Sequence, residues 1–307
     1  MRISSRAYLD AINVHLSRAG EKIELLSMQI SSGRRLSKPS DDPLAVRAIV
    51  DARADLAATL NRQKVLAKGE RLTSVADVAL DGMGAGLRRV HDIGLGGTQP
   101  GLDENGRRAL AMEIRSVRQS LIDHANASVA GDCVFAGRLS PDPPFEEVAG
   151  VVTYSGTSEG AELWVAPGRP MEVTIPGDRL FNFEDASGVR AVPDVDRDMF
   201  ALLEDLASAI EAGNDAETLA CMTDFDALSG HVTQQRGVLG ARAARLATAQ
   251  VSAADVELHA REILTETEGV DMVQAMLDLQ NEELAYQAAL AAVAKMVQLP
   301  TLFQMDW

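Results

Sequence analysis

The residues best suited to acid–base or metal chemistry are scattered along the chain, without the spacings that such chemistry needs. The histidines fall on different predicted helices: His15, His91, His124, His231 and His259. Glu257, His259 and Glu262 do not make the H-E-x-x-H pattern that places two zinc ligands on one helix face, so a solvated helix face is the simpler interpretation. Two adjacent pairs of carboxylates, Asp41-Asp42 and Glu146-Glu147, do not form the cage of oxygens that calcium requires.

The sequence patterns typical of nucleotide binding, thiol chemistry and hydrolysis are not recognised either. The glycines between positions 82 and 101 follow a helix and lack the G-x-G-x-x-G spacing after a strand. Cys133 and Cys221 lie far apart, with no C-x-x-C and no nearby histidine, so neither a disulfide framework nor a zinc site is predicted. No G-x-S-x-G, Walker or EF-hand pattern occurs. We therefore expect a protein that is not an enzyme, with no catalytic, cofactor-binding or metal site.

The composition favours long helices packed through narrow seams. Of the 307 residues, 46% are hydrophobic but only 4% are aromatic. The formal net charge of −16 repels the phosphate backbone, so nucleic acid is not an expected partner. Residues 1–38 nevertheless carry a net charge of +4, and such a basic segment can meet an acidic surface of a neighbouring subunit.

The N-terminal segment carries the strongest periodic signal. Apolar or small residues recur at alternating intervals of three and four, the heptad pattern that keeps one stripe of a helix against a partner helix: Leu9, Ile12, Leu16, Ala19, Ile23, Leu26, Ile30 and Gly33. A turn-rich joint follows, in which Asp42 is the expected N-cap and Pro43 the first residue of the next helix.

The C-terminal segment repeats this pattern. Its predicted stripe has the same heptad spacing: Met272, Met276, Leu279, Glu283, Tyr286, Leu290, Val293 and Val297. A second stripe, starting at Val273 and Leu277, widens the apolar face enough for a helix that contacts more than one partner. Pro300 is expected to end the helix. The apolar tail, with Leu302, Phe303 and Trp307, favours assembly, because a soluble monomer would bury such side chains.

Between these segments the sequence predicts helices around a small β-rich insert. Helices are expected over 43–90, 104–129, 198–213 and 217–268, with a break at 94–101. Seven of the eleven prolines fall within 131–195, among predicted strands at 151–154, 162–165 and 171–175. The predicted segments are 1–42, 43–130, 131–198, 199–268 and 269–307. The predicted fold class is mainly α, a long antiparallel coiled-coil bundle made by the N- and C-terminal regions with a central β domain.

Neither a signal peptide nor a membrane span is predicted. The N-terminus has no apolar run of signal-peptide length, and no segment approaches the ~18 uninterrupted apolar residues of a membrane-spanning helix. Membrane insertion is therefore not expected, and this feature alone would favour the cytoplasm.

Several motifs resemble a known family. They are the start Met1–Ser4, the joint Ser31–Ala45, the passage Val134–Gly137 with Pro144-Phe145 after it, and the end Leu302–Gln304. The joint resembles the flagellin superfamily. The other motifs, with the P-S-D-D-P form of the joint, are most similar to the hook-associated protein 3 (FlgL) family of hook-filament junction proteins. The joint residues that carry the resemblance are Gly33, Arg34, Pro39, Ser40, Asp41, Asp42 and Pro43.

The resemblance implies a structural adaptor of the bacterial flagellum that links hook-associated protein 1 to the flagellin filament. It implies that the terminal helices form coiled coils within and between subunits in a ring or helical layer, while the insert faces outward. It also implies secretion by the flagellar type III export apparatus without a cleaved signal, with the help of an export chaperone. The expected location is then extracellular.

Three alternatives remain at this stage. A flagellin that builds the filament itself shares the joint motif. A cytoplasmic coiled-coil scaffold would share the heptads but would need a partner domain. An enzyme hidden in the β-rich insert is disfavoured, because the insert is too short to hold a deep site of its own.

Overall fold

The computed structural model describes residues 2–36, 38, 42–99, 101–138, 143–166 and 168–302, without the side chains of residues 2–10, 166 and 296–302. Two compact units result: a terminal unit of residues 1–58 and 255–307, and a central unit of residues 59–254. Two long helices, α2 (Pro43–Gly97) and α6 (Asp215–Glu268), contribute to both units.

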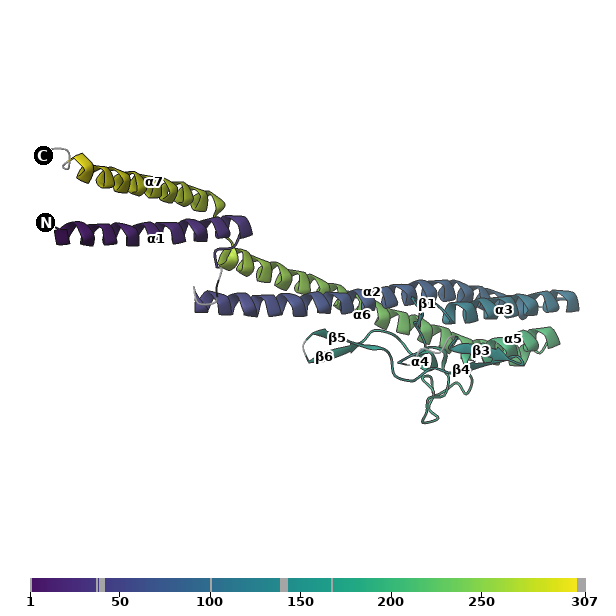
Figure 1. Cartoon of the computed structure of the whole chain (residues 1–307). Coiled ribbons are helices and arrows are strands. Elements are labelled where there is room, and N and C mark those ends of the chain that lie inside the picture. The colour runs from purple at the N-terminus through teal and green to yellow at the C-terminus, as the bar shows by residue number, and fades with distance from the viewer. Residues whose placement is uncertain are drawn as a thin grey trace. The chain divides into compact units, whose positions relative to one another are not determined.

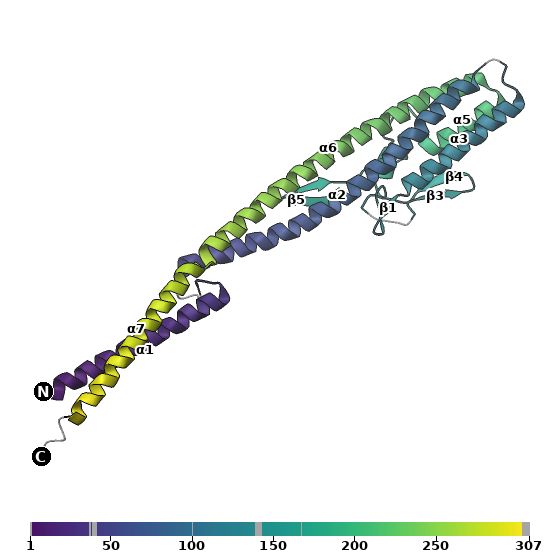
Figure 2. The ribbon, with the colours of Figure 1, turned by 90° about the horizontal axis from the view of Figure 1, so that it is seen from above.

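The terminal unit contains a pair of antiparallel helices, α1 (Arg2–Ser32) and α7 (Met272–Leu302), which lie side by side in both views (Figures 1 and 2). The direction is set by an antiparallel bridge between Arg34 and Gly269 and by an ion pair between Lys22 and Glu282. Helix α7 includes Pro300, where the sequence predicted its end. A proline inside a helix removes one hydrogen bond and crowds the carbonyl of the residue four positions before it, which can kink the helix without ending it.

The central unit combines helices with three two-stranded antiparallel sheets (Figure 1). The helices lying wholly within it are α3 (Glu104–Ala125), α4 (Gly177–Phe181) and α5 (Met199–Ala212). The paired strands are β1 (Ser128–Val129) with β2 (Asp132–Cys133), β3 (Phe145–Val148) with β4 (Val151–Tyr154), and β5 (Glu162–Ala166) with β6 (Arg169–Glu172). The predicted fold class, mainly α with a small β-rich insert and a helical bundle formed by the N- and C-terminal regions, is confirmed.

Local capping explains most helix boundaries. The Asp198 carboxylate accepts hydrogen bonds from the Phe200 and Ala201 amides, both at 2.9 Å, and so starts α5. Gly213, with φ +70°, ends it in the left-handed conformation. Helix α3 ends at Ala125, before the predicted Val129, because the Asn126 side chain pairs with the backbone of Phe145 instead.

Helix α2 runs to Gly97, past the predicted break at 94–101. The glycines permit close helix packing there. A Cβ atom on Gly94 would lie 2.1 Å from the Met222 sulfur, and one on Gly97 would lie 2.9 Å from Ile210. The spacing of these glycines therefore reflects contact with α5 and α6 and not a chain break.

The core of the central unit joins the helices to the insert. An aromatic cluster has ring centroids 5.0–6.3 Å apart and consists of Phe135, Phe145, Tyr154, Phe181, Phe183 and Phe200. Buried Arg118 of α3 donates to the Phe200 carbonyl (3.0 Å), the Glu147 carboxylate (2.7 Å) and the Gly150 carbonyl (2.8 Å). It therefore holds the β3–β4 hairpin against α3 and α5.

Candidate assembly interface

The α1 face of the terminal helix pair carries the predicted heptad positions. Leu26 is buried, with 8% of its surface exposed. Four further predicted positions are half-buried on the same stripe: Ile12, Leu16, Ile23 and Ile30. The side chain of Leu9 lies outside the described residues. The exposed fraction of α1 thus follows the alternating three- and four-residue spacing of the sequence pattern.

The α7 face uses a different set of positions from the predicted stripe. Ala275 is buried at 5% exposure, and half-buried residues continue its heptad spacing: Leu279, Glu282, Tyr286, Ala289 and Val293. Leu279, Tyr286 and Val293 belong to the predicted stripe. Met272, Met276 and Leu290 do not face α1 and are 40%, 49% and 45% exposed. The side chain of Val297 lies outside the described residues.

Sequence reasoning missed the alanines and Glu282 of this inner face. The signal was present, since positions 275, 279, 282, 286, 289 and 293 also alternate by three and four. Alanine fits either an inner or an outer face of a helix, however, and the longer side chains one position further along made the other stripe look stronger.

One ion pair crosses the helix pair near its middle. The Lys22 ammonium donates to the Glu282 carboxylate. That hydrogen bond and the charge of Glu282 raise the pKa of Lys22 above its ordinary value. Because Lys22 is exposed, the pair contributes little to stability.

The joint connects α1 to α2 and lies against the passage between α6 and α7. Gly33 has a left-handed φ of +69° and ends α1, while Asp42 caps α2 by accepting from the Ala45 amide at 3.0 Å. The predicted N-cap is confirmed. Arg34 donates through Nε to the Glu268 carboxylate at 2.7 Å. The motif residues Pro39, Ser40 and Asp41, like Phe303 and Trp307 of the tail, lie outside the described residues, as does the side chain of Leu302.

A second apolar face of the terminal unit has no partner among the described residues. On α7 it comprises large side chains that are 40–71% exposed: Met272, Val273, Met276, Leu277, Leu284 and Leu290. On α1 it comprises Val14, Leu25 and Met28 at 39–49%. A cluster of large exposed apolar side chains on one helix, as on α7, is typical of a protein–protein interaction site.

Two curated proteins are similar to the chain over nearly its whole length. Flagellar hook-associated protein 3 of Escherichia coli (strain K12) is 26% identical over 295 residues, which cover 91% of each chain. Flagellar hook-associated protein 3 of Salmonella typhimurium is 23% identical, with both chains covered completely. The predicted resemblance to the hook-associated protein 3 family is confirmed. No protein-family model matches the sequence.

Solved structures related to hook-associated protein 3 share the fold. A putative flagellar hook-associated protein from Vibrio parahaemolyticus matches with a TM-score of 0.65 at 20% identity, covering 75% of this chain and all of its own. FlgL of Xanthomonas campestris matches with a TM-score of 0.61 at 17% identity, covering 70% of this chain and 99% of its own. The flagellar junction protein FlgL of Legionella pneumophila matches at 0.56 and 16%, covering 73% and 100%.

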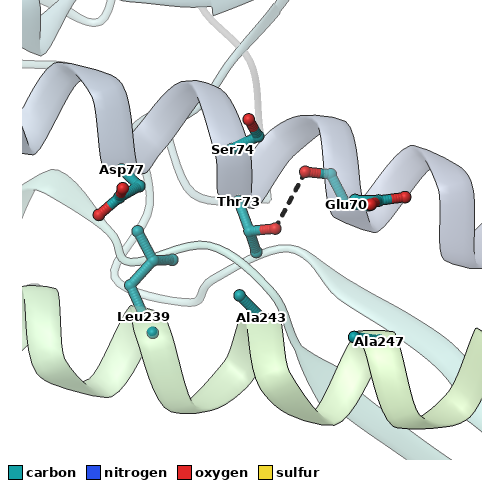
Figure 3. A pocket seen from close by; sticks show the side chains of 8 residues that line it. Glu70, Thr73, Ser74, Asp77, Leu239, Ala243 and Ala247 are labelled. Carbon is teal, nitrogen blue, oxygen red and sulfur yellow. Dashed lines mark hydrogen bonds between the residues drawn. The ribbon is translucent and has the colours of Figure 1, made fainter.

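A cavity in the central unit of this relative of hook-associated protein 3 is lined by small, aliphatic and polar residues. Figure 3 shows a cavity of about 290 Å³ between α2 and α6 in the central unit. Its lining includes Ala243, Ala247 and Gly240, and the Thr73 hydroxyl is occupied by the Gly69 and Glu70 carbonyls at 3.0 Å. The described residues hold no group of three or more potential metal ligands. None of the helices described combines the length and apolar character of a membrane span.

Proposed function

We propose that the chain is a non-catalytic structural adaptor of the bacterial flagellum that links hook-associated protein 1 to the flagellin filament. The observation that carries this proposal is that the terminal helices have two apolar faces with different surroundings. One stripe of each helix packs inside the α1–α7 pair, and a second apolar face remains exposed. The names of similar proteins, flagellar hook-associated protein 3 and the flagellar junction protein FlgL, support this proposal.

The proposed mechanism is mechanical. The exposed face, represented by Val273, Leu277 and Leu284, packs against helices of neighbouring subunits in a ring or helical layer. Contacts of this head-to-tail kind propagate from one subunit to the next. Hook-associated protein 1 covers one end of the layer and flagellin the other.

Export without a cleaved signal peptide is part of the same proposal. The exposed apolar face would promote aggregation in the cytoplasm before assembly, and the apolar residues of the C-terminal sequence would add to this tendency. An export chaperone that covers them, followed by passage through the flagellar type III apparatus, resolves this conflict. The final location is then the extracellular hook-filament junction.

Deleting the gene tests the proposal directly. We expect electron microscopy to show hooks without filaments and immunoblots to detect flagellin in the culture medium. A plasmid copy of the unaltered gene should restore filaments. Intact filaments in the deletion strain would refute the junction role and would favour the alternative, a redundant flagellin subunit.

Point variants connect the phenotype to the exposed face. Leu277→Glu with Leu284→Glu places charges on side chains that are 51% and 65% exposed, so the isolated subunit should stay folded while filament attachment is lost. Ala285→Glu with Ala292→Glu adds the same two charges with the same spacing at exposed positions of the helix outside the Val273–Leu277–Leu284 stripe, and this matched control should support filaments.

A further inference from the structure

The seam between α1 and α7 does not by itself define one axial alignment of the helices. In the observed alignment, Ile30 lies level with Ala275, Leu26 with Leu279, and Leu16 with Ala289. This pairing follows from the Lys22–Glu282 ion pair and the Arg34–Gly269 bridge. Both stripes repeat every seven residues. A slide by one heptad, about 10 Å along the axis, would again place apolar stripe against apolar stripe.

The side chains of the seam discriminate weakly against such a slide. A shift in one direction would set Glu282 beside Leu16 in place of Ile23, which exchanges one aliphatic neighbour for another. The Lys22–Glu282 pair would be lost, but it is exposed, and exposed pairs contribute little. Small residues such as Ala275 and Ala289 fit opposite either a leucine or an isoleucine. The register must therefore be set elsewhere.

The joint supplies contacts that one alignment alone can make. The Arg35 amide donates to the Glu268 carbonyl at 2.8 Å, and the Val270 amide donates to the Gly33 carbonyl at 3.2 Å. These bonds join the end of α1 to the passage between α6 and α7. A slide of α1 along α7 by one heptad, about 10 Å, would break both of them, because each hydrogen bond needs its donor and acceptor within about 3 Å of one another.

The Glu268 carboxylate forms ion pairs with two arginines at this joint. It accepts from Arg34 at 2.7 Å and from Arg53 at 2.8 and 2.9 Å, the latter through both oxygens. The Glu268 side chain is only 17% exposed, so these pairs are less screened than open surface pairs. As the last residue of α6, Glu268 also faces the negative end of the helix dipole, and this position is unfavourable unless cations neutralise it.

We propose that Glu268 is the positioning residue that sets the axial register of α1 against α7. It does so through the Glu268 clasp, which we define as Gly33–Arg35, Arg53 and Glu268–Val270. The register decides which exposed apolar side chains of α1 and α7 lie at the same height. The clasp thereby shapes the surface offered to neighbouring subunits. This inference concerns the isolated subunit and stands whether or not the proposed junction role holds.

Cross-linking between cysteine pairs reads the register directly. Leu16→Cys with Ala289→Cys reports the observed alignment. Leu16→Cys with Glu282→Cys and Ile23→Cys with Ala289→Cys report slides by one heptad in the two directions. Each pair is treated in the purified full-length protein with a short bifunctional thiol reagent. Cys133 and Cys221 are buried, so the reagent reaches the introduced cysteines first. Peptide mapping then identifies the cross-linked pair.

With the clasp intact, the pair at 16 and 289 should cross-link at least about tenfold faster than either slid pair. Glu268→Gln, which keeps the shape of the side chain but removes its charge, should bring the slid pairs to within about threefold of the native one. Glu266→Gln makes the same chemical change at an exposed position of the same helix and should leave the preference intact. Far-ultraviolet circular dichroism checks that each variant remains helical.

A second variant removes the backbone part of the clasp without touching a charge. A Cβ atom on Gly269 would lie 2.4 Å from the Thr265 carbonyl oxygen, so Gly269→Ala must displace the backbone that bonds to α1. It should also release the slid pairs. If Glu268→Gln keeps the tenfold preference for the native pair, Glu268 does not set the register and the proposal is overturned, whatever the result for Gly269→Ala. Equal rates for all three pairs with the clasp intact would overturn it as well.

Discussion

Replacing Leu26 with alanine tests whether the inner stripe of α1 holds the terminal helix pair together. Leu26 is the large side chain of α1 that the described pair buries best, at 8% exposure, and its neighbour Leu25 is 39% exposed. Leu26→Ala and Leu25→Ala remove the same atoms from adjacent positions of one helix. The difference between the two variants therefore isolates the effect of burial from any change in helix propensity.

The size of the effect follows from the atoms removed. Leucine to alanine deletes three carbons, at about 0.8 kcal/mol each when buried, and a two-helix seam open to solvent on both sides relaxes around the gap. We expect Leu26→Ala to destabilise the pair by about 2–3 kcal/mol. Leu25→Ala should cost about 0.5 kcal/mol or less in the isolated subunit, since its side chain is already partly in water.

Native-state hydrogen exchange followed by mass spectrometry measures this difference. A loss of 2–3 kcal/mol corresponds to a roughly 30- to 160-fold faster exchange of the amides of α1 and α7. Leu25→Ala should change these rates by about twofold or less, and peptides of the central unit provide the internal reference. Equal effects of the two variants, or unprotected amides in the unaltered α1 and α7, would refute the assignment of the inner stripe.

Two further predictions concern the central unit. Arg118→Leu should lower its unfolding free energy by about 3–5 kcal/mol in urea denaturation, because the Glu147 carboxylate and the Phe200 and Gly150 carbonyls lose a buried donor. Burial raises the pKa of Asp198 above its ordinary value, so folding favours the protonated acid, and its ionisation costs stability as pH rises through the raised pKa. The stability of Asp198→Asn relative to the unaltered protein should therefore increase from about pH 4 to about pH 7. Denaturant titration of both proteins at these two pH values measures the difference.

The sequence predicts the helices and their caps well where the physical cause is local. Asp42 and Asp198 cap the helices that follow them because a short acceptor side chain satisfies the first free amides. Strand β4 matches its predicted bounds because the alternating run 151–154 is enclosed by turn residues. On α1, large aliphatic side chains occur at the heptad positions, so the inner stripe could be recognised from spacing and size together.

Features that depend on distant residues could not be predicted in this way. Gly94 and Gly97 look like a helix break in sequence, and only the position of Met222 and Ile210 shows that they make room for neighbouring side chains. Glu268 looks like an ordinary surface glutamate. Its role depends on Arg34, which is 234 positions away in the chain and brought within 2.7 Å by the fold.

Helix α7 shows that spacing alone does not separate the inner face of a helix from a second apolar face. A single helix buried against one partner needs one apolar stripe, and the structure finds it at Ala275, Leu279 and Tyr286. The larger side chains lie one or two positions away and remain exposed, as Met276 and Leu277 illustrate. A monomer gains nothing from exposed apolar residues of this size, since they favour aggregation. Their presence beside an inner stripe that is already satisfied is the physical reason to infer a second set of partner helices for α7.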